Sequence, residues 1–242
     1  MKPEPMKTQL IWDLPTRLFH WLLVAACTAA FVFALASPEQ SRAFDIHMLC
    51  GMLLLPLMLF RLLWGVAGSR YARFKSFLYN PLEAFKYVSA TFSGRAEHHP
   101  GHNPAASYAI AAMLVLTLGT VISGLLIPGN KIFEDLHEAV SYSLLGVIGM
   151  HLLGVLVHTV VKRENVVFSM LSGNKMAPAG VGIPSSHLLV GLLLLAMMGS
   201  WSAAVVKNYD FTTRRLEVPL AGATLQMGKS GQTHGEHNDE DD

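Results

Sequence analysis

The sequence predicts an all-α membrane protein, a helical bundle with a four-helix core and a fifth transmembrane helix. Composition is the first indication, because 52% of the 242 residues are hydrophobic and 14% are charged, whereas soluble domains contain about 25% charged residues. Five long apolar segments are the second indication. Histidines in or beside these segments are the third, since ionisable groups at membrane depth are costly and mark functional sites.

The apolar segments have the length that a membrane crossing requires. A helix needs ~20 apolar residues to cross the hydrocarbon layer, and Arg61 is the only Asp, Glu, Lys or Arg within any segment. Cys27 and Cys50 lie inside the first two segments, which favours packing over a disulfide or a metal site. The segments are residues 18–36, 46–68, 105–128, 139–161 and 183–206.

The first segment also resembles a secretory signal, with lysines before it and Ala34-Leu35-Ala36 at its end. Its 19 residues exceed the usual apolar stretch of roughly 7–15 residues, and His20 and Trp21 stand near its start. We therefore expect it to be retained as a membrane helix.

Lysine and arginine alternate between the loops, and this asymmetry sets the orientation. The N-terminal segment and the loops after the second and fourth helices are rich in them, so we expect these on the cytoplasmic side of a bacterial inner membrane. The residues are Lys2, Lys7, Arg17, Arg70, Arg73, Lys75, Lys86, Arg95, Lys162, Arg163 and Lys175, against Arg42 and Lys131 in the alternate loops. A net charge of +1 gives no indication of nucleic-acid binding.

Three regions follow: a four-helix membrane domain over residues 1–177, an additional transmembrane helix over 178–206, and a periplasmic polar and acidic tail over 207–242. Apolar and charged residues interleave over residues 81–92, which predicts a short helix on the membrane surface. We expect disorder in residues 228–242, where His234 and His237 read as solvated rather than metal-binding.

The histidines fall into two levels. His47 and His137 begin the second and fourth helices on the periplasmic side, whereas His20 begins the first helix on the cytoplasmic side. His151 follows His137 by 14 residues, which places it roughly 21 Å deeper and within about 40° of the same face. The chain thus offers a periplasmic pair, His47 with His137, and a cytoplasmic pair, His20 with His151.

Two stacked histidine pairs suit two b-type haems, each iron held by two imidazoles and without an open position for substrate. Outer-sphere electron transfer is then the expected task, and the absence of a CxxCH motif excludes covalent c-type haem. Gly51 and Gly149 would let haem approach, although glycine is equally normal at membrane helix contacts. Arg17 and Arg61 could bind the cytoplasmic haem propionates or serve as positive-inside anchors.

Several motifs carry a resemblance to the bacterial di-haem cytochrome b561 proteins and the related b-type cytochrome subunits of nickel-iron hydrogenases. The resemblance spans about residues 10–177 and joins these motifs in the family's order. They are WDLPTRLFHW at residues 12–21, RLLWG at 61–65, YARF at 71–74, GHNP at 101–104, LHE at 136–138 with His151, RENVV at 163–167 and GNK at 173–175.

This resemblance implies that His20, His47, His137 and His151 bind the two irons, and that the chain passes electrons between a periplasmic redox protein and membrane quinone. The periplasmic partner would be a cytochrome c, a hydrogenase or another dehydrogenase, and the chain an electron-carrier subunit rather than a self-contained enzyme. His158 lies seven residues after His151 on nearly the same face, so it is an alternative ligand. We expect quinone to react near the cytoplasmic haem, where Arg17, Arg61, His158 and His187 lie at similar depth.

Two other functions account less well for these features. A transporter that uses buried histidines to bind a metal ion or relay protons would be expected to have carboxylates in the membrane, and none of the five apolar segments contains Asp or Glu. A passive membrane anchor would leave the histidine pairing unexplained.

Overall fold

The computed structural model describes residues 5–95, 97–128 and 130–228. Within these residues five helices are long and apolar enough to cross a membrane, which confirms the predicted helical membrane bundle. They are α1 Leu14–Ala36, α2 Arg42–Ala67, α4 Pro104–Leu126, α5 Lys131–Lys162 and α7 Leu188–Lys207.

Polar residues begin these helices by satisfying backbone N–H groups that have no partner within the helix. Asp13 accepts a bond from the Thr16 amide at 2.7 Å, and Asn103 accepts one from the Ala106 amide at 2.8 Å. α5 begins at Lys131, eight residues before its apolar segment, and Asn130 caps it. α5 therefore extends beyond its apolar segment, because its charged first turn continues the helix outside the hydrocarbon layer.

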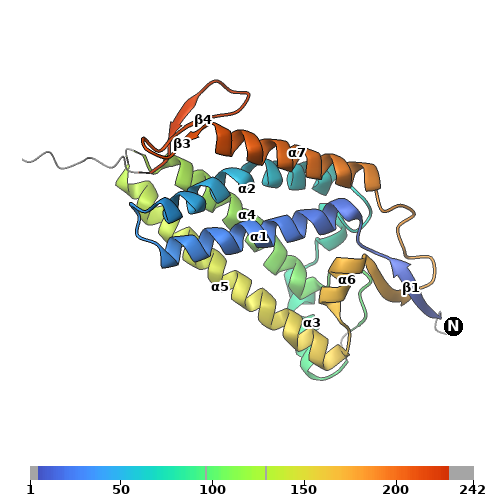
Figure 1. Cartoon of the computed structure of the whole chain (residues 1–242). Helices are drawn as coiled ribbons and strands as arrows, with labels where there is room; N and C mark the ends of the chain where they lie inside the picture. The colour runs from blue at the N-terminus through green and yellow to red at the C-terminus, as the bar shows by residue number, and fades with distance from the viewer. Residues whose placement is uncertain (1–4, 96, 129, 229–242) are drawn as a thin grey trace, which may run out of the picture.

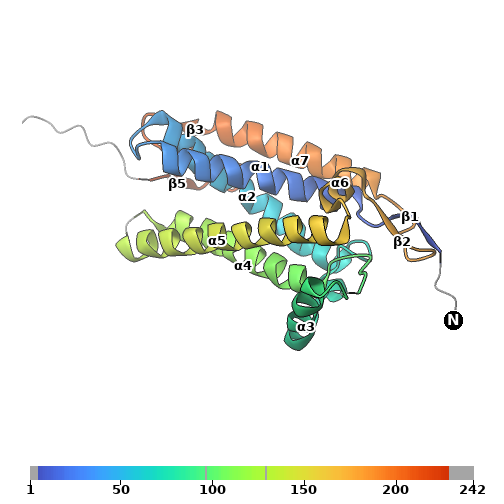
Figure 2. The same cartoon turned by 90° about the horizontal axis from the view of Figure 1, so that it is seen from below.

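The helices form two layers, which Figure 2 shows from the side: α1, α2 and α7 in one, α4 and α5 in the other. α1 packs along α2, and α4 packs along α5. α2 also contacts α4, and this joins the layers. Among the described residues α1 and α5 make no comparable contact. The largest apolar cluster lies around Phe19, Leu57 and Met58, between α1, α2, α4 and α7.

Two short helices and a 3-10 turn lie at one end of the bundle. They are η1 Phe74–Phe77, α3 Pro81–Phe92 and α6 Val166–Ser172. The predicted short helix over residues 81–92 is thus present, and it projects across the direction of the long helices (Figure 2). Its exposed side chains include Leu82 and Phe85, whereas Tyr87 is buried.

The same end carries a strand pair that the sequence analysis did not predict. β1 Met6–Leu10 pairs antiparallel with β2 Asn174–Pro178, so that Met6 faces Pro178 and Leu10 faces Asn174. Ile11, Trp12, Tyr71, Ala177 and Ile183 form a buried cluster beside these strands. We refer to this end of the molecule as the β1–β2 end (Figure 1).

The opposite end carries a small antiparallel sheet, also not predicted, of strands β3 Tyr209–Asp210, β4 Arg215–Glu217 and β5 Thr224–Gln226. We call residues 208–228 the cap (Figure 1). An ion pair of 2.9 Å between Arg214 Nε and Asp45 Oδ1 joins it to the start of α2, and both side chains are buried. The predicted disordered tail, with His234 and His237, lies almost wholly outside the described residues.

Candidate functional site

His47 and His137 meet near the cap end of the bundle, one from each layer. His47 lies in the second turn of α2 and His137 in the second turn of α5. Their ring centroids are 6.0 Å apart and the ring planes stand at 85°. The structure therefore brings the predicted periplasmic pair into one place, with both imidazoles close enough to reach one ion between them.

Both rings are oriented by bonds to the neighbouring helix in the same layer. His47 Nδ1 lies 2.9 Å from the carbonyl oxygen of Ala30 in α1, and His137 Nδ1 lies 2.9 Å from that of Thr120 in α4. A carbonyl oxygen can only accept, so each Nδ1 carries the hydrogen and donates it. Each Nε2 is left with its lone pair, which is the arrangement of a metal-binding histidine held by an outer hydrogen bond.

Glycines provide the space around these rings. A Cβ added at Gly124 would lie 3.0 Å from Cε1 of His137, so glycine lets α4 approach this ring. A Cβ added at Gly51 or Gly149 would meet nothing within 4 Å, which leaves room for a flat group beside either helix. The sequence did not indicate a role for Gly124, because the His137 ring that it contacts belongs to another helix.

His20 and His151 approach the opposite, β1–β2 end from α1 and α5. His20 lies six residues after the start of α1, with its Nδ1 buried and without a hydrogen-bond partner among the described residues. His102 stands just before α4, and its burial, followed by the charges of Arg61, Lys175, His151 and His20, lowers its pKa to about 3. His102 also packs on Trp12 and Phe77.

The two arginines are held by protein groups. The Arg17 guanidinium donates to the Leu171 carbonyl oxygen, while its Nε is buried without a partner among the described residues. Arg61 is 4% exposed and donates from Nη1 to the Ala72 carbonyl oxygen at 3.0 Å. Three aromatic rings surround its guanidinium, those of Phe19, Phe74 and Phe77.

Asp13 organises the start of the first two helices, and sequence reasoning did not single it out. Its carboxylate is 1% exposed and accepts bonds from Ser69 Oγ and from Trp64 Nε1, the latter at 3.3 Å. This network ties the entry of α1 to the exit of α2 and so fixes the depth of His20. The only sequence signal for this network was that Asp13 belongs to the WDLPTRLFHW motif and Trp64 to the RLLWG motif.

His158 and His187 do not join His20 and His151 in one cluster. His158 Nε2 lies 3.1 Å from Glu164 Oε2 beyond the end of α5. His187 precedes α7 in a left-handed conformation, with φ of 53°, and its ring packs on Trp64 at 5.3 Å. The four polar side chains expected at one depth, Arg17, Arg61, His158 and His187, thus have separate partners.

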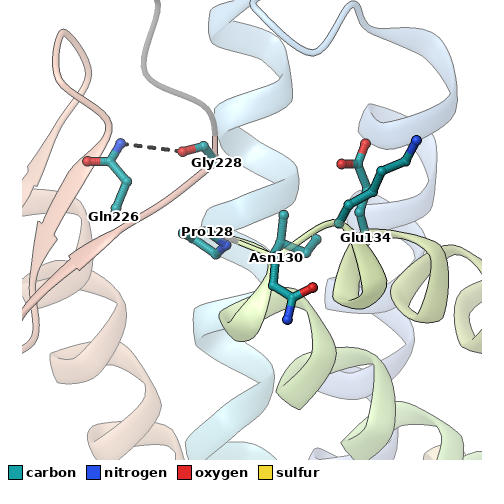
Figure 3. A pocket seen from close by; sticks show the side chains of 7 residues that line it. Pro128, Asn130, Glu134, Gln226 and Gly228 are labelled. Carbon is teal, nitrogen blue, oxygen red and sulfur yellow. Dashed lines mark hydrogen bonds between the residues drawn. The ribbon is translucent and has the colours of Figure 1, made fainter.

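A hollow of about 440 Å³ opens at the cap end, between the end of β5 and the turn that joins α4 to α5 (Figure 3). Gln226 donates to the Gly228 carbonyl oxygen at 3.4 Å along one wall. Asn130, which caps α5, and Glu134, in its first turn, stand on the opposite wall. The hollow therefore lies beside the start of α5, the helix that carries His137.

The donor set suits haem rather than a metal ion bound by protein alone. Among the described residues no group of three or more His, Cys, Asp or Glu side chains could hold a metal ion. A porphyrin supplies four nitrogens and needs only two from the protein, which is what each histidine pair offers. The oriented Nε2 atoms of His47 and His137 fit this role.

The comparisons with known proteins agree with this donor set. A family model for prokaryotic cytochrome b561 matches residues 11–173. No curated protein and no solved structure matches the chain. The matched residues include all four histidines of the two pairs and end before α7 and the cap.

Proposed function

The chain belongs to the prokaryotic cytochrome b561 family and is a membrane electron-transfer protein with b-type haem, and from this premise we propose that it carries two bis-histidine haems and passes electrons between a periplasmic redox partner and membrane quinone. Haem b supplies a reversible one-electron iron couple when bound. The protein's part is to hold the iron ligands, orient them and exclude other ligands.

The His47–His137 pair carries the proposal. Both Nδ1 atoms donate to backbone carbonyls of rigid helices at 2.9 Å, so neither ring needs to change tautomer or turn before it binds iron. The two rings come from different layers of the bundle, and a haem bound there would join the layers. Gly124 supports this arrangement because any larger residue would press on the His137 ring.

The second haem is assigned to His20 and His151 on a contact that distinguishes the two candidate histidines of α5. His158 Nε2 is engaged with Glu164 at 3.1 Å, and Glu164 is held in turn by Lys175. Freeing His158 for iron would leave this carboxylate without its hydrogen bond. His151 has no such engagement among the described residues, and it follows the first ligand of α5 by 14 residues, the spacing that the family resemblance implies.

We assign the β1–β2 end to the cytoplasm of a bacterium and the cap end to the periplasm, with the chain in the inner membrane. The arginine- and lysine-rich loops gather at the β1–β2 end, as the positive-inside rule requires. The proposed division keeps residues 1–177 as the di-haem domain, 178–206 as the additional helix and 207–242 as the periplasmic region. A periplasmic cytochrome c, hydrogenase or other dehydrogenase would contact the cap end, near His137 and the hollow beside it.

Reaction with quinone tests the proposed function directly. We expect the dithionite-reduced, detergent-purified protein to be reoxidised by a short-chain quinone, with return of the oxidised haem spectrum. His47→Ala and His137→Ala should each remove the same haem, because both contribute to one iron. A matched control is His187→Ala, which lies outside both pairs and should leave the spectrum unchanged. A protein that binds haem but is not reoxidised by any quinone would contradict the proposal.

A further inference from the structure

Four polar side chains from separate parts of the chain meet at the end of α5. Glu164 is at their centre, with its Oε2 at 3.1 Å from His158 Nε2 and its Oε1 at 3.2 Å from Lys175 Nζ. His98, from the loop before α4, approaches the same Oε2 with its Nδ1 at 4.0 Å. Arg163 adopts a left-handed conformation, with φ of 53°, and this turn returns Glu164 towards His158.

The exposure of these side chains decreases from the surface inwards. His98 is 37% exposed, Glu164 19% and His158 15%. His158 lies within the membrane-spanning helix α5, and Glu164 lies just beyond the end of that helix. Histidine and carboxylate side chains in such a row are typical of proton relays in membrane proteins. One bridging water, or a small rotation of His98, would complete the 4.0 Å step.

The hydrogen-bond partners of the two histidines suit proton transfer. His98 Nε2 lies 3.0 Å from the Met176 carbonyl oxygen and so carries a hydrogen, which leaves the Nδ1 lone pair facing Glu164. His98 can therefore take up a proton at Nδ1 and pass it to the carboxylate. His158 faces Glu164 with Nε2, and its other ring nitrogen remains available for a substrate.

Electrostatics favour the ionised form of Glu164. Burial alone would raise the pKa of Glu164, but the hydrogen bond with His158 and the charge of Lys175 outweigh it and lower the pKa. Glu164 is consequently ionised at neutral pH. Tyr87 of α3 also faces it, and burial raises the pKa of this tyrosine.

We propose that His98, Glu164 and His158 form the route by which protons pass between the cytoplasm and a quinone bound beside α5. This inference rests on the proposed function. Reduction of a quinone to a quinol takes two electrons, which the redox partner supplies, and two protons, which come from cytoplasmic water. For each proton, transfer starts with a proton on Glu164 and the His158 hydrogen on Nδ1. As Nδ1 gives its proton to the quinone, Nε2 takes the proton of Glu164, which leaves the carboxylate accepting from Nε2–H as in the structure. Return of the His158 hydrogen to Nδ1 and reprotonation of Glu164 by His98 reset the route. Oxidation of a quinol runs the same transfers in reverse.

Stopped-flow mixing of the reduced haem-loaded protein with a short-chain quinone tests this route. We expect Glu164→Gln to slow haem reoxidation and the accompanying proton uptake by about 10²-fold. Reoxidation by ferricyanide takes no proton and should keep its rate. Glu97→Gln is the matched control, because Glu97 is an exposed carboxylate in the same loop as His98. His98→Ala should slow the quinone reaction as well, and added imidazole should restore it.

A second measurement needs no haem. The infrared carboxyl band of Glu164, identified by its loss in Glu164→Gln, should appear at higher pH in His158→Ala, because the hydrogen bond that lowers its pKa is gone. The inference is overturned if Glu164→Gln and His98→Ala both keep the wild-type rate with quinone. If Glu164→Gln loses haem, His98→Ala decides alone. Failure of the unaltered protein to react with quinone would overturn the proposed function itself, and this route with it.

Discussion

Replacing Arg214 by alanine should release the cap from the bundle. Arg214 pairs with Asp45 at 2.9 Å and also donates to the Glu39 and Ser41 carbonyl oxygens at 2.7 and 3.0 Å. The side chains are 10% and 1% exposed, so the variant leaves the Asp45 carboxylate buried without its cation. Such a change typically costs about 3–5 kcal/mol. Because 1.4 kcal/mol corresponds to tenfold in an equilibrium constant, the cap should open about 10²-fold to several thousandfold more often.

Amide hydrogen exchange of residues 208–228 measures this opening, since exchange reports local unfolding free energies. Arg215→Ala is the matched control, because Arg215 is exposed and its one side-chain hydrogen bond within the described residues is a 3.4 Å contact with Gln226. It should change stability by no more than about 0.5 kcal/mol. Adding Asp45→Asn to Arg214→Ala should recover part of the protection, because a neutral amide is less costly to bury. Unchanged exchange in Arg214→Ala would refute the assignment of this pair as the anchor of the cap.

Three further outcomes are expected. His151→Ala should remove one haem spectrum and leave the other, whereas His158→Ala should keep both; the reverse result would assign the iron to His158. Cysteines introduced in residues 69–103 should react with an impermeant reagent only after spheroplasts are lysed, whereas cysteines in the cap should react before lysis. The opposite labelling pattern would contradict the assigned orientation. The pKa of Glu164 in the folded protein lies below its ordinary 4.5. Glu164 therefore stabilises the fold above pH 4.5, and this stabilisation is lost as the pH falls through the folded-state pKa. Glu164→Gln should flatten this pH dependence of thermal unfolding, and an unchanged profile would contradict the stabilising role of Glu164.

The membrane helices were predictable because their signal is local. An apolar segment of sufficient length indicates a spanning helix whatever surrounds it. The start of α7 shows the limit of that signal, since the fifth apolar segment begins at residue 183 but the helix begins at Leu188. Ile183 is apolar for another reason, because it packs with Ile11 and Trp12 beside β1 and β2. Pro184, together with the left-handed His187, delays the helix start.

The two small sheets were not predictable, because their pairing joins distant residues. Met6 pairs with Pro178, and β1 is a five-residue strand in which Lys7, Thr8 and Gln9 give no apolar pattern. The Arg214–Asp45 contact has the same character. A sequence pattern reports on neighbours along a helix or strand, whereas these contacts depend on how the ends of the bundle are covered.

One pair of the candidate site could be placed from the sequence. Placing His47 and His137 at the same depth followed from their positions at two helix starts, and the structure brings their rings to 6.0 Å. The choice between His151 and His158 could not be made from direction, because both lie on nearly the same helical face. The distinguishing contact is with Glu164, and it depends on the left-handed turn at Arg163, which the sequence does not indicate.

The number of haems per chain tests the account most directly. A pyridine haemochrome assay on the detergent-purified protein, combined with its reduced visible spectrum, measures both the type and the number of haems. Two histidine pairs predict two low-spin b haems in each chain. One haem would leave the fold intact and eliminate one pair. A protein purified without haem would contradict the assignment of His20, His47, His137 and His151 as iron ligands.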